Sequence, residues 1–340
     1  MARLSDFDYD LPEERIAQEP LADRADARLL WLHKSTGHVQ HRRFREIPDI
    51  LRPGDLLVVN DTRVTALRLY GRKPTGGRVE CLLLRERDSG EFEALVRPAR
   101  RLGPGTVVEF EEGLAAEIRL DLGGGQRLIR FFPDERLGEK LAQAGEVPLP
   151  PYIGRKLSDP ERYQTVFARQ GGSAAAPTAG LHFTPEIVTE LHTRGIGIAR
   201  VTLDVGLDTF RPVTSDNIAE HRMHGEWCEI SDEAAAKIAS CRGRVIAVGT
   251  TVVRTLETFA VGSRRVESGR RRTEIFIAPG HRFQVIDGMF TNFHMPRTTM
   301  LMMIGALAGV EEVMEAYRQA VAERYRFLSF GDSMLIADPA

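Results

Sequence analysis

Apolar residues follow two different patterns along this 340-residue chain. Between residues 65 and 147 they form short alternating runs separated by glycine turns, which is typical of a small antiparallel β-barrel. Glycines 123–125 separate two of these runs and predict a hairpin turn, which argues against a nucleotide-binding loop. The strands expected in this region are 78–84, 92–96, 106–110, 115–120 and 127–132.

Strand and helix patterns alternate after a stiff P-L-P-P-Y linker at residues 148–152. Such alternation predicts a largely parallel or mixed sheet covered by helices. The strands expected are 28–33, 56–60, 196–205, 244–249, 273–278, 283–290 and 327–336, and the helices 185–194, 232–241, 252–260, 298–308 and 311–324. We therefore expect an α/β fold, with a mixed-sheet or barrel-like main domain of residues 1–64 and 148–340. A small antiparallel β-barrel domain, all-β, is inserted at residues 65–147.

Composition and charge bear on the partners and the cellular location of the protein. The net charge of −2 gives no overall positive field that would attract a nucleic acid, so any nucleic-acid-binding surface must be a local patch. The three cysteines, Cys81, Cys228 and Cys241, form no C-x-x-C pair, which argues against both a disulfide framework and a thiolate zinc site. The cysteine pattern therefore predicts a reducing, cytoplasmic location. The acidic N-terminal segment and the lack of a run of ~20 apolar residues predict neither secretion nor a membrane partner.

One long stretch of small residues is unusual: residues 172–184 read G-S-A-A-A-P-T-A-G-L-H-F-T. Thr184 is a good N-cap and Pro185 suits the first position of a helix, so a helix is expected to start there. Small residues cannot fill a core but let backbone approach a ligand closely, with Thr178, His182 and Thr184 as polar groups. The other interpretation is a plain flexible connector.

Polar side chains follow several of the expected strands, where sites in α/β proteins commonly lie. Asn60, Asp61, Thr62 and Arg63 end the buried L-L-V-V-N strand, although strands also end this way without any function. Asp208 follows the strand that ends near residue 205.

A second polar cluster contains His221, His224 and Glu226. Metal sites need several converging ligands, and H-x-x-H alone is weak evidence for one, so no metal is expected. General acid–base chemistry by His224 or Glu226 is favoured over a metal site. The alternative is a purely structural role, as a capped turn before a strand at residues 228–230.

Two further strand ends offer binding groups. Thr250 and Thr251 lie at a helix start, where free N–H groups and hydroxyls suit an anion, although Thr251 could equally be an ordinary N-cap. The Gly-Lys-Ser/Thr of a P-loop is absent. Asn292 and His294 can each form a hydrogen bond with the edge of a heterocycle.

Arginines crowd one connection of the inserted domain, at Arg97, Arg100 and Arg101. Guanidinium groups suit phosphate. A solvated charge cluster is the more frequent explanation of such a group.

Seven motifs, taken in order along nearly the whole chain, resemble the S-adenosylmethionine:tRNA ribosyltransferase-isomerase family of queuosine biosynthesis. They are D-F-D-Y-D-L-P-E-E-R-I-A-Q-E-P (6–20), V-V-N-D-T-R-V (58–64), P-T-A-G-L-H-F-T (177–184), T-L-D-V-G-L-D-T-F-R-P-V (202–213), M-H-G-E-W (223–227), V-G-T-T-V-V-R-T-L-E (248–257) and T-N-F-H-M-P-R-T-T-M-L-M (291–302). Seven long motifs in sequence are far more specific than any one of them. Composition and spacing alone reach only an α/β protein with a β insertion.

The resemblance implies that S-adenosylmethionine is consumed as a ribosyl donor, without a metal or redox cofactor. The implied acceptor is 7-aminomethyl-7-deazaguanine at the wobble position of a tRNA anticodon stem-loop. The implied products are epoxyqueuosine-tRNA, adenine and methionine. Such chemistry needs a base to remove a proton beside the sulfonium, a donor to help adenine leave, and a pocket that excludes water. The protein is expected to be a monomer.

The resemblance also implies roles for individual residues. The catalytic residues expected are His182, Asp208, His224 and Glu226. The substrate-binding residues expected are Asn60, Asp61, Thr62, Arg63, Thr178, Gly180, Phe183, Thr184, Thr250, Thr251, Arg254, Asn292 and His294. The tRNA-binding residues expected are Arg97, Arg100, Arg101, Arg271 and Arg272.

The chain departs from the family pattern around residues 267–278. Residues 267–280 read E-S-G-R-R-R-T-E-I-F-I-A-P-G and lack the usual aromatic residue before T-D-I-F-I-Y-P-G. Any substrate contact assigned to that aromatic pair is therefore in doubt. Two other functions are weighed: an S-adenosylmethionine-dependent tRNA methyltransferase and a non-catalytic tRNA-binding protein. The first should carry a glycine-rich turn after its first strand, which is absent, and the second would not concentrate His, Asp and Glu at strand ends.

Overall fold

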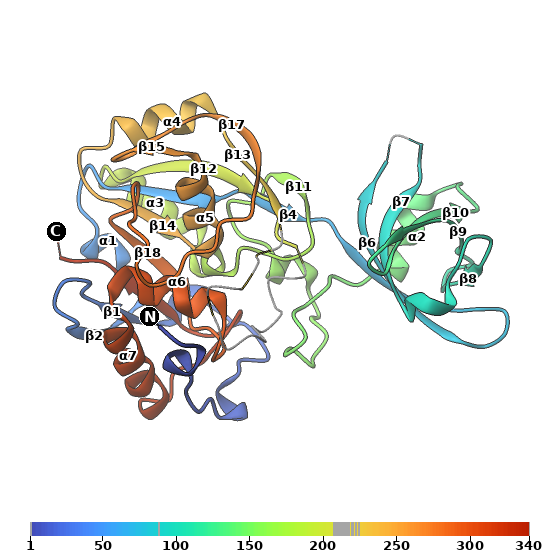
Figure 1. Cartoon of the computed structure of the whole chain (residues 1–340), viewed down its shortest axis with the longest axis horizontal. Coiled ribbons are helices and arrows are strands. Elements are labelled where there is room, and N and C mark those ends of the chain that lie inside the picture. The colour runs from blue at the N-terminus through green and yellow to red at the C-terminus, as the bar shows by residue number, and fades with distance from the viewer. Residues whose placement is uncertain are drawn as a thin grey trace. The chain divides into compact units, whose positions relative to one another are not determined.

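The computed structural model describes residues 2–87, 89–206, 218, 221, 223 and 225–339. The chain forms two compact units (Figure 1). The main unit contains Met1–Thr62, Pro150–Gln170 and Ala176–Ala340, and the second contains Arg63–Leu149 and Gly171–Ala175. The sequence pattern places the corresponding boundaries at 64/65 and 147/148.

The main unit is built on an open nine-stranded mixed sheet. Four neighbouring strands, β12, β3, β14 and β18, are parallel, whereas β13, β17, β19 and β2 introduce antiparallel pairs. From edge to edge the strands are β17 (Gly269–Thr273), β13 (Glu226–Ile230), β12 (Gly197–Leu203), β3 (Leu56–Asn60), β14 (Val245–Val248), β18 (Gly288–Asn292), β19 (Ser333–Ile336), β1 (Arg28–Leu32) and β2 (Val39–Arg43). The predicted mixed sheet is confirmed, and it does not close into a barrel.

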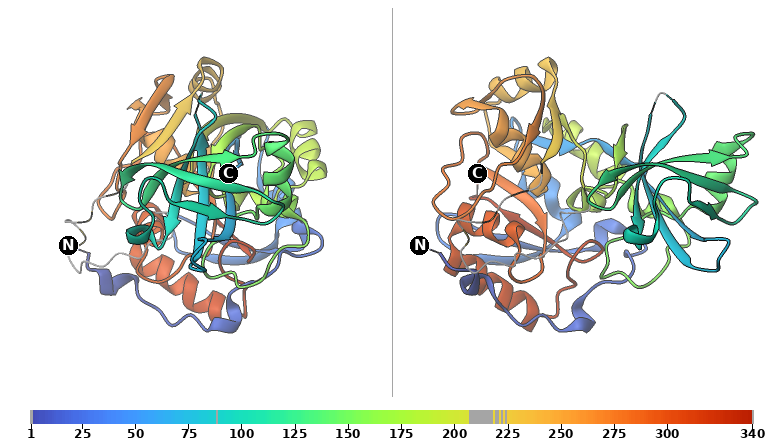
Figure 2. Two further views of the ribbon diagram at one scale, coloured as in Figure 1. Left: turned by 90° about the vertical axis from the view of Figure 1, so that its right-hand side faces the viewer. Right: turned by 45° about the vertical axis from the view of Figure 1, so that its right-hand side comes forward.

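Helices cover both faces of this sheet, and all five residues of the interior strand β3, of which the first four are apolar, are buried. Figures 1 and 2 show α5 on one face and α3 on the other. Side chains of α3 pack in one core cluster with Leu57 and Val59 of β3. The helices of this unit are α1 (Ile47–Ile50), α3 (Pro185–Thr193), α4 (Asp232–Ala239), α5 (Thr250–Phe259), α6 (Thr299–Ala308) and α7 (Val310–Ala322).

Helix starts follow the expected capping chemistry. The hydroxyl of Thr184 accepts a hydrogen bond from the N–H of Ile187 at 3.4 Å, and Pro185 is the first helical residue, so the predicted start of α3 is confirmed. Ser231 and Thr298 cap α4 and α6 in the same way.

The second unit is a closed six-stranded antiparallel barrel, seen side-on in Figure 2. Inward-facing apolar residues of its strands form a core of their own, which explains the alternation in the sequence. The strands are β5 (Leu67–Arg72), β6 (Arg78–Glu86), β7 (Phe92–Arg97), β8 (Val107–Glu109), β9 (Ala115–Gly123) and β10 (Gln126–Phe132). The unit also contains α2 (Leu137–Ala144), which packs Leu141 into this core. The predicted barrel and the hairpin at glycines 123–125 are confirmed.

Two strands predicted at 273–278 and 283–290 are wrong in position. β17 ends at Thr273, because it is Gly269–Thr273 that pairs with β13. Further on, the N–H groups of Gln284 and Val285 donate to the carboxylate of Glu257 at 3.0 and 3.1 Å instead of to a neighbouring strand. β18 therefore begins only at Gly288.

The strand predicted at 327–336 is shorter than expected. Leu328 adopts a φ of 69°, the N–H of Gly331 donates to its carbonyl at 3.0 Å, and the resulting turn delays β19 to Ser333. The pattern also misses several short elements. They are β2, β5, α1, α2, β4 (Thr62–Val64), β11 (Gln170–Ser173), β15 (Ala260–Gly262) and β16 (Arg265–Val266).

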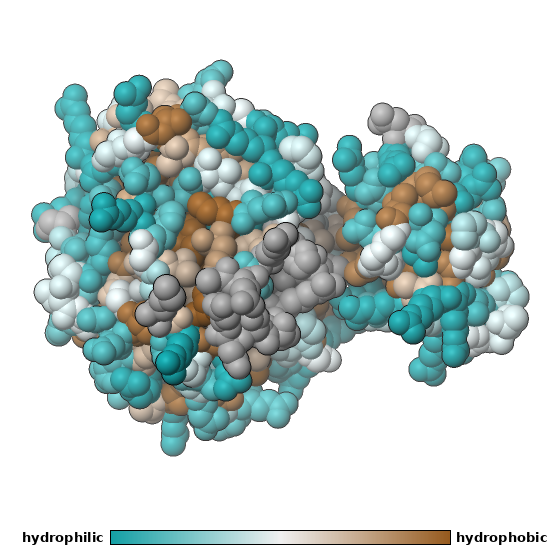
Figure 3. Space-filling view, in the orientation of Figure 1, coloured by the Kyte–Doolittle hydropathy of each residue, from teal (hydrophilic) through white to brown (hydrophobic). Residues whose placement is uncertain are grey.

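Hydropathy describes the face shown in Figure 3, and burial governs two of the three cysteines. Hydrophilic residues dominate the face shown in Figure 3. In the described part of the chain, no helix combines the length and apolar character that a membrane span requires. The three cysteines are free thiols, and burial raises the pKa of Cys81 to about 12 and of Cys228 to about 11, so neither is a thiolate nucleophile near neutral pH.

A buried ion pair fixes the beginning of β3. Asp55 is 2% exposed and accepts hydrogen bonds from the guanidinium of Arg244 at 2.6 Å and from the backbone N–H groups of Arg52 and Arg244. Burial favours the neutral acid, but these hydrogen bonds outweigh it and hold the pKa of Asp55 below its usual value.

We expect Asp55→Asn to lower the free energy of unfolding of the main unit by about 3 kcal/mol, because it leaves the Arg244 guanidinium without its counter-charge. Urea unfolding followed by tryptophan fluorescence measures this, since Trp31 and Trp227 both lie in the main unit. Asp49→Asn, which breaks an exposed pair with Arg194, is the control and should cost under about 1 kcal/mol. Equal losses in the two variants would contradict the role given to Asp55.

Candidate active site

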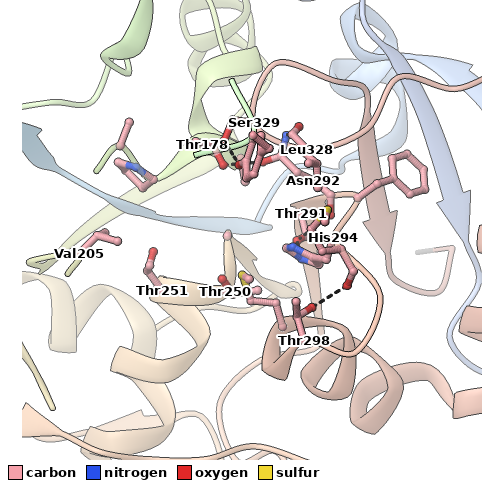
Figure 4. Close-up of a pocket in the computed structure, with 18 of the residues that line it drawn as sticks. Thr178, Val205, Thr250, Thr251, Thr291, Asn292, His294, Thr298, Leu328 and Ser329 are labelled. Atoms are coloured by element: carbon pink, nitrogen blue, oxygen red, sulfur yellow. Dashed lines mark hydrogen bonds between the residues drawn. The ribbon is translucent and has the colours of Figure 1, made fainter. Parts of the chain in front are cut away.

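A cavity of about 400 Å³ lies in the main unit, at the carboxyl ends of β14 and β18 (Figure 4). None of the described residues that line it is Asp, Glu, Lys or Arg, and Tyr152 and His294 are its titratable groups. The lining residues are Pro151, Tyr152, Ala176, Pro177, Thr178, Ala179, Val205, Gly249, Thr250, Thr251, Thr291, Asn292, Phe293, His294, Met295, Pro296, Thr298, Met300, Leu328 and Ser329. Five of the residues predicted to bind substrate line this one cavity: Thr178, Thr250, Thr251, Asn292 and His294.

The start of α5 forms one wall of the cavity. Gly249 links β14 to this helix with a φ of +95°, and a Cβ added there would contact Ala179 at 3.5 Å. Thr250 and Thr251 follow as the first helical residues, and Figure 4 shows both at the helix start. The first N–H groups of a helix have no partner within it, so this wall offers an anion both N–H groups and a hydroxyl.

The end of β18 forms the opposite wall. The Asn292 amide nitrogen donates to the carbonyl of Leu328 at 3.3 Å and lies 3.1 Å from Nε2 of His182, while its oxygen accepts from the Thr178 hydroxyl at 2.9 Å. Because an amide nitrogen can only donate, His182 Nε2 is the acceptor and hence the deprotonated nitrogen of a neutral ring. Asn292 is thus held in one orientation by three neighbours.

His294 lies in the cavity wall beside Asn292. Its Nε2 is 2.8 Å from the hydroxyl of Thr291 and its backbone N–H donates to the hydroxyl of Tyr317 at 3.0 Å. Burial lowers the pKa of His294 to about 3, so the ring is neutral near pH 7. A neutral imidazole can donate or accept a hydrogen bond at the edge of a heterocycle.

His182 is close to this wall but is not among the lining residues. It lies in the 3₁₀ helix η7 (Thr178–His182), packs against the ring of Phe44 at 5.1 Å, and is 5% exposed. Burial first, then the positive charges of Arg24 and Arg326, lower its pKa to about 3. His182 therefore reaches the cavity through Asn292.

The end of β3 supports the site through hydrogen bonds. The Asn60 amide nitrogen donates to the carbonyl of Leu203 at 3.1 Å and to the hydroxyl of Thr251 at 3.3 Å, and its oxygen accepts from the N–H groups of Thr62 and Leu203. Asp61 accepts from the hydroxyl of Thr202 at 2.7 Å, and burial raises its pKa. Neither Asn60, Asp61 nor Thr62 lines the cavity. Arg63 belongs to the second unit.

Glu226 forms a buried ion pair with Arg254, a residue of α5, and each side chain is 7% exposed. The same carboxylate accepts a hydrogen bond from the N–H of Gly206 at 2.9 Å, in the segment that follows β12. One carboxylate therefore holds both the guanidinium of α5 and the backbone of the segment after β12. Its visible role is to fix the chain at Gly206.

Three other residues from the 172–184 stretch serve packing. Phe183 is fully buried against Phe44, and a Cβ at Gly180 would meet Thr165 at 3.1 Å. Thr184 is the N-cap of α3. Residues 172–175 of the stretch belong to the second unit, and residues 176–184 are a structured part of the main unit whose cavity contact comes from residues 176–179.

Asp208 and His224 lie outside the described residues. The predicted tRNA-binding arginines fall into two groups. Arg97, Arg100 and Arg101 are exposed on the barrel unit. Arg97 ends β7, and the other two lie in the following turn, where the buried Arg127 donates to the carbonyls of residues 99 and 102. Arg271 contacts Glu267 and the ring of Phe259, whereas its neighbour Arg272 is exposed.

Tyr152 and Ser329 are cavity residues that the sequence pattern misses. Their hydroxyls are 2.6 Å apart, and burial raises the pKa of Tyr152 to about 12. Tyr152 falls in the P-L-P-P-Y run expected to be a linker, and Ser329 falls in the segment expected to be a strand. The aromatic residue closing the proline run is the one signal that could have indicated a packed position.

The comparisons with known proteins agree with the seven motifs. A family model described as a queuosine biosynthesis protein matches residues 4–336. The chain belongs to this family. Among the described residues of this family member, no three His, Cys, Asp or Glu side chains come together as a possible metal site.

Curated relatives of this queuosine biosynthesis protein match it from end to end. Proteins from Symbiobacterium thermophilum and Pelotomaculum thermopropionicum, each named S-adenosylmethionine:tRNA ribosyltransferase-isomerase, are 52% and 53% identical to it. Each match covers 98% of this chain and 99% of the relative. The crystal structure of an S-adenosylmethionine tRNA ribosyltransferase from Thermotoga maritima is 38% identical, covers 97% of this chain and 99% of its own, and has a TM-score of 0.55.

The neutral histidines predict an acid-dependent loss of stability. A lowered native pKa means that the unfolded chain binds more protons between about pH 3 and 6.5, so stability is complete above pH 6.5 and falls on acidification. On going from pH 7 to pH 5, the His182 group should cost the wild type about 2 kcal/mol of its free energy of unfolding. His182→Gln should not suffer this part of the loss. Urea unfolding at the two pH values, with the exposed His192→Gln as control, measures this. An unchanged pH dependence in His182→Gln would contradict it.

Proposed function

We propose that this chain is an S-adenosylmethionine:tRNA ribosyltransferase-isomerase of queuosine biosynthesis. It transfers the ribosyl moiety of S-adenosylmethionine onto 7-aminomethyl-7-deazaguanine at the tRNA wobble position and isomerises it. The observation that carries the proposal is end-to-end identity of about 50% with relatives of that name. The cavity adds support, because its family motifs converge there and its volume of about 400 Å³ falls in the range of small-molecule sites.

The chemistry sets clear demands on the cavity. A proton leaves the carbon beside the sulfonium, that carbon is transferred to the aminomethyl base, adenine leaves the ribose, and closure of the epoxide expels methionine. Each charged intermediate must be kept from bulk water. An apolar wall with a few fixed polar groups, such as the Thr178–Asn292–His182 chain, supplies such a setting.

We assign the methionine carboxylate to the start of α5, where Thr250 and Thr251 combine hydroxyls with free N–H groups. We assign a base edge to Asn292, Thr178 and the neutral His294. Tyr152 and Ser329 are hydroxyl groups on the same cavity and extend this set.

The four candidates for proton transfer divide by their surroundings. His182 and Glu226 contact Asn292 and Arg254 respectively, and their geometry supports positioning roles. Asp208 and His224 stay candidates for proton transfer on the family resemblance alone. The first pair is tested by comparing adenine release by His182→Ala and Glu226→Ala with that by the wild type. Full adenine release by both variants would exclude both residues from proton transfer.

S-adenosylmethionine is then a substrate, and a reaction without metal or redox cofactor stays a prediction. The RNA partner is the anticodon stem-loop, for which the exposed Arg97, Arg100, Arg101 and Arg272 are proposed phosphate contacts. Arg271 is a weaker candidate because Glu267 holds it. A monomer in the cytoplasm completes the proposal.

The deciding experiment supplies the protein with S-adenosylmethionine and tRNA that carries the aminomethyl base. We expect adenine and methionine to be released in equal amounts, with a matching gain of mass on the tRNA. The control is the same tRNA with guanine at the wobble position, which should release neither. S-adenosylhomocysteine as the product would instead indicate a methyltransferase, and binding without any product would indicate a tRNA-binding protein.

The assignment of the carboxylate site has its own test. We expect Thr250→Val to raise the KM for S-adenosylmethionine about 10-fold, because a hydrogen bond to a charged group contributes about 1.5 kcal/mol or more. The KM for tRNA should stay unchanged. The surface variant Thr189→Val on α3 is the matched control. An unaltered KM for S-adenosylmethionine in Thr250→Val would place the carboxylate elsewhere.

A further inference from the structure

Trp227 is an exposed indole on an otherwise ordinary strand. Side chains alternate along β13, so that Glu226, Cys228 and Ile230 are buried while Trp227 and Glu229 face solvent. Trp227 is 50% exposed, whereas the other tryptophan, Trp31, is 8% exposed. A half-exposed indole leaves a large apolar surface in water, which is unfavourable unless something covers it.

The neighbouring edge strand β17 surrounds this indole with guanidinium groups. Trp227 is directly opposite Arg272, and Glu229 is opposite Arg270. The Arg270 guanidinium lies 5.2 Å from the centre of the indole ring. The guanidinium of Arg272 lies against the backbone at Gly225, two residues before Trp227.

The arginines of β17 divide between the two faces of the sheet. Arg271 and Thr273 point towards α5, where they contact Phe259 and Thr258. Arg270 and Arg272 therefore point to the opposite face together with Trp227. Of the acidic groups near them, Glu274 is 3.9 Å from Arg272 in an exposed pair, which costs little to exchange for another anion.

This group of side chains lies at the same end of the sheet as the cavity. The N–H of Asp204 donates to the carbonyl of Trp227 at 2.9 Å, and the next residue, Val205, lines the cavity. An RNA base that enters the cavity would therefore bring its neighbouring nucleotides close to Trp227.

We propose that Trp227 is a stacking platform for an unpaired nucleotide adjacent to the modified base, and that Arg270 and Arg272 contact the phosphates beside it. The proposal rests on the proposed function, which makes an anticodon loop the substrate. Indole faces stack on any unpaired base, and guanidinium groups beside them neutralise the backbone. The platform holds the RNA and takes no part in the bond-making steps.

Kinetics on a substitution series test the platform. We expect Trp227→Ala to raise the KM for tRNA about 5- to 150-fold, the range for loss of one base stack, and Trp227→Phe to restore most of it. The KM for S-adenosylmethionine should stay at the wild-type value in both. Arg270→Gln with Arg272→Gln should lower the slope of log Kd for tRNA against log salt concentration by about 1.4 to 1.8. A KM for tRNA that Trp227→Ala leaves unchanged would overturn the proposal.

Fluorescence tests the same surface without catalysis. Titration of the wild type with an anticodon stem-loop RNA should quench tryptophan emission, and Trp227→Phe, which retains only the buried Trp31, should show no such quenching. Equal quenching in both proteins would overturn the proposal. If the wild type released no adenine in the activity assay yet showed quenching that depends on Trp227, the proposed reaction would fail and the RNA platform would stand. Adenine release with no dependence on Trp227 would support the reaction and overturn the platform.

Discussion

The side-chain amide of Asn60 is the constraint on which the site depends. It ends the central buried strand and forms four hydrogen bonds, two with the backbone of Leu203, one with the N–H of Thr62 and one with the hydroxyl of Thr251. These bonds tie the ends of β3 and β12 to the first turn of α5. Since Asn60 is 2% exposed and its amide is fully bonded, it builds the cavity without touching it.

The cavity combines fixed polar groups with an absence of charge among its described lining residues. His294 is neutral because it is buried, and Asn292 cannot rotate because three partners hold its amide. Glu226 and Arg254, two charged residues near the site, are paired with each other. Such an arrangement costs the protein little reorganisation when a charged substrate enters, because its dipoles already point where they are needed.

Much of this could be predicted from the sequence, and the exceptions have physical causes. The cap at Thr184, the apolar strand before Asn60 and the barrel strands all follow from local patterns. The strand expected at 283–290 fails because the distant Glu257 carboxylate takes the N–H groups of Gln284 and Val285. No periodicity reveals such a long-range contact. The same holds for the site, where motifs indicate Asn292 and His182 separately but not that one holds the other.

The chain of hydrogen bonds through Thr178, Asn292 and His182 also limits how related sequences can vary. Each hydrogen bond in this chain has one fixed direction, since the Thr178 hydroxyl donates to the Asn292 amide oxygen and the Asn292 amide nitrogen donates to the His182 imidazole. An acid at position 292 would offer no proton to His182, and an apolar residue at 178 would leave the amide oxygen without its donor. These three positions, 114 residues apart at their widest, are therefore expected to change together or not at all.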